Sequence, residues 1–396
     1  MKITENRSSS VKIREILLSD LESMWKLCSN PTLSLIDTRR LSLDEFNELW
    51  HHRWNIKDGQ DPQHTLGWVL VHPEDGVVGF IGNIPVDWWI ENREIKGFAA
   101  ISWIVDPRFR VLGLGLYQKF FLDQQTFFLL ATTANPVAAK VCEMNGALPI
   151  PVESLLWEIK SVDYYYRKLT RFYQYIKETG QGDKKISLLI RLLNIFPGFR
   201  FTALVYGSYL ALRRIGKDGL SHGEDSSSNI EQFSHFGEEF DGLWQKNREK
   251  VGSTVVRSSC FLNWRHFLHP KSKGRTYALK YTDNGEVKGY ITFREMGVRE
   301  DILGVYHVTD LFYDFDDHRI ADILLSAAFN FSKITLNAVA FEVGGLIPEI
   351  MESLKKGFPT VKRTKHYTYW YKCPENENTL LNKKWWLSRI DGDQNL

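Results

Sequence analysis

The four cysteines of this sequence stand far apart, at Cys28, Cys142, Cys260 and Cys373. No two of them form the closely spaced pair typical of zinc sites and redox-active disulfides, so we expect no metal centre. No stretch of roughly 18 uncharged apolar residues occurs, so no membrane-spanning helix is expected. The polar N-terminal segment lacks the apolar core of a secretory signal. These absences predict a protein of the reducing cytoplasm.

A strong excess of charge is also missing, because 50 Lys and Arg are balanced by 48 Asp and Glu. The balance conceals one basic segment, Lys160–Lys217, which holds 12 Lys and Arg against 3 Asp and Glu. Such a segment, rich in Tyr, Leu and Phe, can lie on an anionic membrane or pack as a helical pair with solvated basic side chains. We favour the packed pair, leave peripheral membrane contact open and expect no nucleic-acid partner.

Helix and strand signals alternate regularly over the first 160 residues. Ser42 followed by Glu45 resembles a capping box, and Asn135-Pro136 is typical of a helix start. Strands are expected at 11–18, 65–72, 77–85, 94–105, 126–132 and 155–159, and helices at 19–28, 42–54, 116–125 and 135–145. The order predicts an α+β fold, a three-layer α/β arrangement with helices on both faces of one sheet.

The same order of elements returns after the Gly-, Ser- and acid-rich stretch that ends at Asn229. Helical signals fill 230–268, 319–332 and 347–356, and strands are expected at 275–281, 287–294, 306–312, 336–342 and 365–372. We therefore expect two copies of one module. The predicted domains are 1–160, a helical linker at 161–229, and 230–396.

The segment from Val105 to Gly115 is the strongest candidate for a binding site. It carries Arg110-x-x-Gly113-x-Gly115 between a predicted strand and a predicted helix. Glycines let the backbone approach a ligand closely, and a helix N-terminus offers unpaired N–H groups to a phosphate. The pattern favours a pyrophosphate cradle, with an ordinary glycine turn as the alternative.

Two blocks together carry a family resemblance. Val105-x-Pro107 leads into the loop, and Asn135-x-x-Ala138-x-x-x-Cys142-x-x-x-Gly146 follows one helix and one strand later. They closely resemble the cofactor-binding core of the GCN5-related N-acetyltransferase (GNAT) superfamily over about residues 11–159, and the second module resembles it more weakly. The resemblance implies two GNAT-like domains in tandem and an acyl-CoA-dependent N-acyltransferase with acetyl-CoA, or another acyl-CoA, as donor.

The resemblance also implies roles for individual residues. The backbone of Ile104 and Val105 would bond the pantetheine arm in a gap between two strands. A backbone N–H at a bulge in this strand would polarise the thioester carbonyl. The remaining predicted cofactor contacts are Arg110, Val111, Leu112, Gly113, Leu114, Gly115, Asn135 and Ala138.

The catalytic candidates are Cys142, Glu94 and Ser102. The family often has Tyr at the Cys142 position, where it protonates the leaving thiolate, so the thiol is a candidate acid, with simple packing as the alternative. Glu94 is a candidate base, as are Asp87 and Glu91 in the loop that we expect before its strand, although we favour a solvated surface position for each.

The second module lacks a phosphate loop, because Asp314, Asp316 and Asp317 follow the corresponding strand and would repel a pyrophosphate. We expect it to shape the acceptor side instead. His307 and Asp310 could form an acid–base pair there or a satisfied interior pair, and Asp391 and Asp393 could belong to a frayed polar terminus.

Two short segments suggest a kind of acceptor. Phe261-Leu262-Asn263-Trp264-Arg265 and the Trp386–Asp393 tail resemble bacterial tandem-GNAT proteins of surface-polysaccharide biosynthesis. The resemblance implies a small-molecule or glycan acceptor, such as an amino sugar of a glycan precursor. Two alternatives stay open: an aminoacyl-tRNA-dependent transferase of the peptidoglycan cross-bridge type, and a non-catalytic binding protein with this fold.

Overall fold

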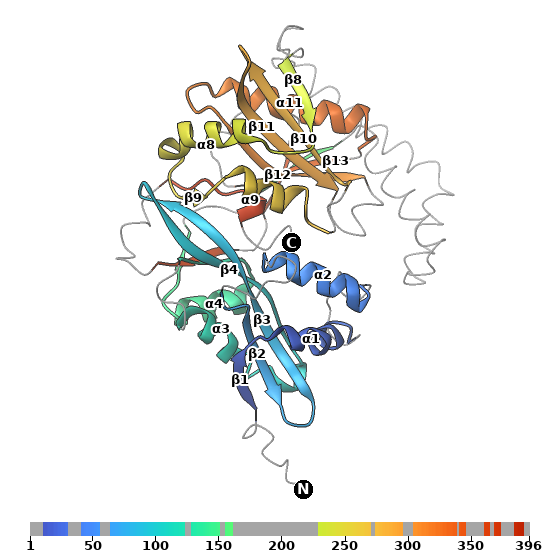
Figure 1. Cartoon of the computed structure of the whole chain (residues 1–396), viewed down its shortest axis with the longest axis vertical. Helices are drawn as coiled ribbons and strands as arrows, with labels where there is room; N and C mark the ends of the chain where they lie inside the picture. Colours follow the sequence, from blue (N-terminus) through green and yellow to red (C-terminus); the bar gives the residue numbers. More distant parts are fainter. Residues whose placement is uncertain are drawn as a thin grey trace, which may run out of the picture.

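The computed structural model describes residues 11–30, 41–55, 64–122, 128–150, 155–160, 229–270, 274–295, 304–338, 340–345, 360–364, 368–373 and 384–391 (Figure 1). The predicted linker, apart from Asn229, and the predicted helix at 347–356 lie outside these residues. No helix in the described ranges is long and apolar enough to span a bilayer.

The first half of the chain follows the predicted order of elements. Its strands are β1 (Lys12–Glu15), β2 (Gly67–His72), β3 (Gly76–Ile90), β4 (Arg93–Val105), β5 (Phe128–Ala134), β6 (Leu148–Pro149) and β7 (Leu155–Lys160). Its helices are α1 (Leu21–Cys28), α2 (Leu43–Arg53), α3 (Leu114–Leu122) and α4 (Pro136–Met144), with 3-10 turns at Leu18–Asp20 and Pro107–Phe109. One apolar cluster joins α1 and α2 to the sheet, and a second joins α3 and α4 to it.

Side-chain caps specify the starts of two helices. Ser42 Oγ accepts a hydrogen bond from the N–H of Glu45 at 3.2 Å, and Glu45 Oε2 accepts one from the N–H of Ser42 at 2.7 Å. This is the predicted capping box at the start of α2. At the start of α4, Asn135 Oδ1 accepts hydrogen bonds from Val137 N and Ala138 N, both at 3.0 Å.

The hairpin of β3 and β4 is longer than predicted. Its turn is formed by Glu91 and Asn92, whose φ angles of 51° and 62° are typical of a tight two-residue hairpin turn. Asp87, expected in a loop, therefore lies on β3, where its carboxylate pairs with Lys96 Nζ at 2.7 Å. The predicted loop before Glu94 is thus confined to the turn at Glu91 and Asn92. Its extension back to Asp87 was wrong because the apolar Trp88–Ile90 segment continues the strand.

The second half forms another sheet with its own helices. Its strands are β8 (Ile230–Phe233), β10 (Thr276–Asp283), β11 (Glu286–Glu295), β12 (Val305–Tyr313), β13 (Ala340–Gly345) and β14 (Thr360–Thr364). The helices are α8 (Glu238–Val251), α9 (Ser259–His266) and α11 (Arg319–Ile334). Residues 230–233, predicted as helix, form a strand because they pair with β10 along the sheet edge.

The two sheets exchange strands. The first has the order β1-β2-β3-β4-β5-β15-β6, in which β15 (Thr368–Lys372) comes from the end of the chain. The second has the order β14-β7-β13-β12-β11-β10-β8, in which β7 comes from the first half. The ranges 1–160 and 230–396 therefore do not correspond one to one to the two sheets.

A two-residue strand and a side-chain hydrogen bond also join the two halves. The short strand β9 (Thr254–Val255) pairs with Trp88 and Trp89 of β3. Trp264 Nε1 donates a hydrogen bond of 2.8 Å to the carbonyl oxygen of His52 on α2. These bonds fix helix α9 relative to the first sheet.

The tail is ordered through Asp391, contrary to the frayed terminus that we considered. Trp386 is fully buried against Phe312, Tyr313 and Phe315. The 3-10 turn Arg389–Asp391 packs against β12. This segment covers the second half of β12, where β12 no longer pairs with β13.

A buried ionic network surrounds the same strand. Arg257 Nη2 lies 3.2 Å from Asp310 Oδ1 and 3.2 Å from Asp391 Oδ1, and all three side chains are at most 1% exposed. His307 Nδ1 lies 2.6 Å from Glu342 Oε2. His307 and Asp310 therefore have separate partners, and the structure does not support the acid–base pair that the sequence suggested.

Candidate active site

Strands β4 and β5 run parallel and then separate. Their paired residues are Gly97 with Phe128, Phe98 with Leu129 and Ala99 with Leu130. Beyond Ala99 no strand among the described residues pairs with the β5-facing edge of β4, while β5 pairs along its other edge with β15. The backbone of Ile101–Val105 on this edge is thus available to a ligand. The family resemblance implies a gap of this kind for pantetheine, and that contact stays a prediction.

A bulge distorts β4 beside this gap. Gly82 of β3 pairs with Ile101 and Phe80 pairs with Ile104, so Ile81 faces two residues of β4, Ser102 and Trp103. Ser102 has a φ of 56°, a left-handed conformation that is uncommon for any residue other than glycine. Unusual backbone geometry of this kind often accompanies functional sites. The bulge lies where the resemblance places the N–H that polarises the thioester.

The loop after β4 turns directly into α3. Within it the amides of Leu112, Gly113 and Gly115 donate to carbonyl oxygens of the loop itself at 2.9–3.3 Å. In the described part of the chain the N–H groups of Val111 and Leu114 have no such bond. Arg110 is exposed, and no ion pair joins it to a described residue. Of the predicted phosphate contacts, the N–H groups of Val111 and Leu114 and the side chain of Arg110 are the most available for a ligand.

The two glycines of the loop lie close to neighbouring side chains. A Cβ on Gly113 would lie 2.7 Å from Cγ2 of Val105, and one on Gly115 would lie 2.6 Å from Cδ1 of Ile13. Trp103 adds to this packing, because its Nε1 donates to the carbonyl oxygen of Gly113 at 3.1 Å. The loop is therefore held against β4 and β1, with the N-terminus of α3 at the open end of the gap.

Helix α4 begins at the same edge of the sheet, since β4 and β5 are parallel and each leads into a helix. Asn135 caps α4 with its side chain, and Ala138 is buried beneath its first turn. Both therefore shape the helix start, and their predicted contact with the cofactor stays a prediction. Two helix N-termini at one gap create a positive potential suited to an anion.

Cys142 lies inside α4 and is fully buried in the apolar cluster between α4 and the sheet. Burial raises the pKa of its thiol to about 12. An ordinary thiol has a pKa of about 8.5, so this thiol is a weaker acid than the thiol of CoA, and protonating the CoA thiolate from it would be uphill by roughly 5 kcal/mol. The geometry favours the packing role over that of general acid.

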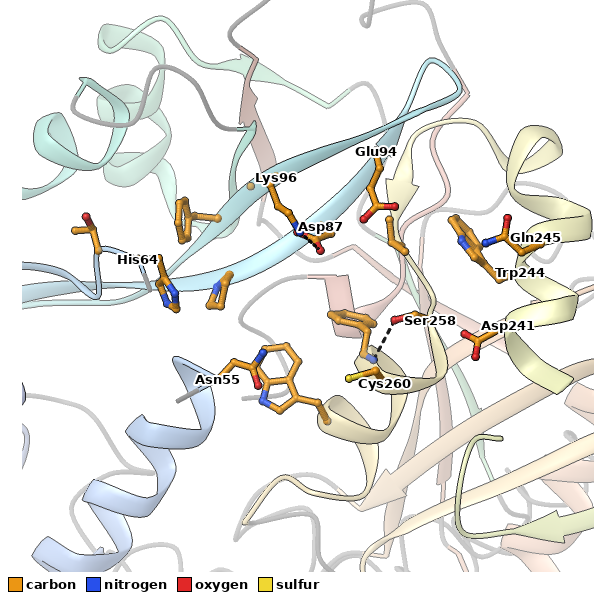
Figure 2. A pocket seen from close by; sticks show the side chains of 17 residues that line it. Asn55, His64, Asp87, Glu94, Lys96, Asp241, Trp244, Gln245, Ser258 and Cys260 are labelled. Carbon is orange, nitrogen blue, oxygen red and sulfur yellow. Dashed lines mark hydrogen bonds and ion pairs between the residues drawn. The ribbon is translucent and has the colours of Figure 1, made fainter. Parts of the chain in front are cut away.

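A cavity of about 770 Å³ lies between the β3–β4 hairpin and helices α8 and α9 (Figure 2). Its charged and polar lining includes Asp87, Glu94, Lys96, His64, Asp241 and Ser258, and its apolar walls include Phe98, Trp244, Phe261 and Trp264. Both halves of the chain therefore contribute to it. Phe261 and Trp264, which the sequence singled out, lie on its wall.

The predicted catalytic residues are not brought together. Glu94 faces the cavity, whereas Ser102 lies eight residues further along the same strand, in the bulge (Figure 2). At about 3.3 Å per residue the two are separated by roughly 26 Å. Glu94 can contact an acceptor in the cavity, but it cannot reach atoms that react at the bulge.

Sequence reasoning missed several residues of the cavity. His64 stands before β2 in a segment without a recognisable motif, and Asp241 and Trp244 belong to α8 in the second half. Their proximity depends on the packing of the two halves. The aromatic content of the predicted second module was the only available signal.

The residues that follow β12 in the second half differ from the loop that follows β4 in the first. Asp314, Asp316 and Asp317 are paired with Lys246, Lys250 and Arg319 at 2.6–2.7 Å. Carboxylates therefore occupy the region before α11 that the phosphate loop occupies before α3. The expectation that the second half lacks a pyrophosphate site stays a prediction.

Solved structures share this fold. A probable N-acyltransferase from Enterococcus faecalis V583 aligns with 95% of this chain and 74% of its own, at 11% identity and a TM-score of 0.52. A GCN5-related N-acetyltransferase from Kribbella flavida aligns with 92% of this chain and 71% of its own, at 11% identity and a TM-score of 0.53. N-myristoyltransferase from Saccharomyces cerevisiae, with bound myristoyl-CoA, aligns with 98% of this chain and 85% of its own, at 11% identity and a TM-score of 0.50.

No model of a known protein family matches the sequence, and no curated protein sequence matches it. At such low identity the structural likeness establishes the fold. Over nearly its whole length, this chain has the α+β fold of GNAT-type acyltransferases.

Proposed function

We propose that this protein is an acyl-CoA-dependent acyltransferase that moves an acetyl or other acyl group to an amine or hydroxyl acceptor. The observation that carries the proposal is the gap between β4 and β5, with the Ser102–Trp103 bulge on one side and the Arg110–Gly115 loop at its open end. A site of this shape suits a long ligand with an anionic end, because the unpaired strand edge offers hydrogen bonds and the helix N-termini attract phosphate.

The order of features along β4 supports placing the two substrates at opposite ends. Four residues of β4 line the cavity: Glu94, Lys96, Gly97 and Phe98. Pairing with β5 ends at Ala99, the bulge follows at Ser102, and the loop begins after Val105. Acyl-CoA would enter from the loop and the acceptor from the cavity, and their reacting atoms would meet near the bulge. The enzyme would act mainly by positioning them.

In the proposed step the acceptor nitrogen or oxygen attacks the thioester carbonyl carbon. A bond forms between the acceptor and that carbon, the C–S bond breaks, and CoA leaves as a thiolate. Backbone N–H groups at the bulge would stabilise the negative charge that develops on the carbonyl oxygen. The acceptor also releases one proton, which a base must take.

An amino sugar of a glycan precursor is the first acceptor to assay. The aromatic walls of the cavity offer flat apolar faces, and the carboxylate of Glu94 can accept hydrogen bonds from amino or hydroxyl groups. We also propose that the two sheets represent two GNAT-like modules in tandem, of which only the first holds CoA.

Donor binding is tested by thermal unfolding with CoA and acetyl-CoA. A ligand at 100 times its dissociation constant should add about 2.7 kcal/mol of stability. Arg110→Glu should weaken CoA binding roughly tenfold, since it places a negative charge beside the pyrophosphate. Lys333→Glu, the same charge change on the exposed side of α11, is the matched control.

Absence of stabilisation by any acyl-CoA would contradict the proposed donor. Stabilisation without acyl transfer to any amine or hydroxyl would favour a binding protein. Binding of tRNA that persists at physiological salt would favour the aminoacyl-tRNA-dependent alternative.

A further inference from the structure

The wall of the cavity nearest the bulge carries a histidine that the sequence did not single out. The His64 imidazole packs against the ring of Phe98, with ring centroids 5.6 Å apart. Phe98 is one residue before the last residue of β4 that pairs with β5. In Figure 2, His64 lies at the end of the cavity opposite Asp241 and Trp244. His64 thus stands where the cavity meets the proposed donor gap.

The backbone holds His64 in this place. The adjacent residue, Thr65, accepts a hydrogen bond of 3.0 Å from Asn83 Nδ2 through its carbonyl oxygen. Asn83 of β3 is paired in turn with Ala100 of β4, two residues before the bulge. The position of the imidazole is therefore coupled to the strand that carries the bulge.

The other charged groups of the cavity either have another bonding partner or lie too far from the bulge. Asp87 pairs with Lys96 at 2.7 Å. Asp241 accepts two hydrogen bonds of 2.7 Å from the N–H and the hydroxyl of Ser259. Glu94 lies at the far end of the strand segment, roughly 26 Å from the bulge. None of these carboxylates is positioned to take a proton near the bulge.

His64 itself is uncommitted. Its Nε2 atom is buried and has no hydrogen-bond partner among the described residues. A buried polar atom without a partner is costly, and an acceptor N–H that reached the ring would remove this cost. Burial lowers the pKa of His64 from its ordinary value of 6.5, so the ring is neutral at pH 7 and can accept a proton.

We propose that His64 is the general base of the acyl transfer and that its substrate is a primary amine arriving in the cavity. This rests on the proposed function. As the acceptor nitrogen bonds to the carbonyl carbon and the C–S bond breaks, one N–H proton passes to the imidazole, directly or through a water molecule. The imidazolium then returns the proton to solvent or to the departing CoA thiolate, which leaves the enzyme unchanged.

The test measures CoA release from acetyl-CoA with glucosamine, spermidine and a lysine-containing peptide as acceptors. His64→Gln should lower kcat/KM by about 100-fold or more, the usual contribution of a general base. Its stabilisation by CoA in thermal unfolding should equal that of the wild type. His235→Gln, at an exposed histidine outside the cavity lining, is the matched control and should retain full activity.

Two further measurements separate a base from a merely structural residue. Below pH 6.5 the wild-type kcat/KM should fall more steeply than that of His64→Gln, because both enzymes lose neutral acceptor amine and only the wild type also loses the neutral form of His64. His64→Gln should lose less activity toward an acceptor amine that is already neutral at the assay pH than toward a strongly basic one.

The possible failures are distinguishable. If the wild type transfers acetyl groups and His64→Gln does so equally well, His64 is not the base, while the proposed function stands. If the wild type binds no acyl-CoA or transfers to none of the acceptors, the proposed function fails and this inference fails with it.

Discussion

One guanidinium faces two buried carboxylates in the core of the second half, and this imbalance predicts an unusual pH dependence of stability. Arg257 contacts both Asp310 and Asp391 at 3.2 Å. Tyr290 donates a further hydrogen bond of 2.7 Å to Asp310. Asp391 is therefore the carboxylate with less compensation, and burial, together with the charge of Asp310, raises its pKa to about 6.

The size of the effect follows from the rise above the ordinary pKa of 3.8. A shift to about 6 corresponds to roughly 3 kcal/mol of folding free energy. Because the folded state holds this proton more tightly, the contribution is fully present below pH 3.8 and is lost as the pH rises through about 6. Asp391→Asn, which cannot ionise, should therefore become more stable relative to the wild type by roughly 3 kcal/mol between pH 4 and pH 7.5.

Urea unfolding of the wild type and Asp391→Asn across this range measures the difference directly. Asp310→Asn is the informative contrast. Burial alone would raise the pKa of Asp310, but the charge of Arg257 holds this pKa below its ordinary value. Replacing the Asp310 carboxylate should therefore cost more stability as the pH rises. A difference between Asp391→Asn and the wild type that stays constant from pH 4 to 7.5 would refute the reasoning.

Two other predictions concern the thiol in α4 and the exchanged strands. Cys142→Ala should lower the melting temperature but leave kcat/KM within about threefold of the wild type, since a buried thiol with a pKa of about 12 is a poor acid; a 100-fold loss in a folded variant would instead support the acid role. A chain ending at Thr364 should lose cooperative unfolding followed by tryptophan fluorescence, because it lacks both β15, which lies between β5 and β6, and the buried tail that contains Trp386 and Asp391. An unchanged sharp transition would show that both segments are dispensable.

The elements predicted correctly are those specified by neighbouring residues. The Ser42–Glu45 capping box and the Asn135-Pro136 helix start depend on contacts within four residues, and both occur as expected. The loop between β4 and α3 also follows from local pattern, because glycines and a helix start are adjacent in sequence. Local chemistry was therefore enough to locate the candidate donor site.

The features that escaped prediction depend on distant partners. The strand signal at 155–159 was visible, but nothing in it indicates that β7 joins the second sheet. Residues 230–233 have no preference strong enough to oppose pairing with β10. Asp391 is polar and close to the chain end, yet Arg257, 134 residues away, holds it in the core. The cavity was not predicted either, because its lining comes from both halves of the chain.

The exchange of β7 and β15 has a consequence for synthesis of the protein on the ribosome. The first sheet lacks the strand between β5 and β6 until Thr368–Lys372 has emerged, and β7 has no partner until β13 has been made. At roughly 5–20 residues per second, translation from Ala134 to Lys372 leaves the edge of β5 unpaired for about 10–50 s. During that interval the nascent chain presents an apolar strand edge of the kind that pairs with other chains, so its yield in cells should depend on chaperones that cover this edge.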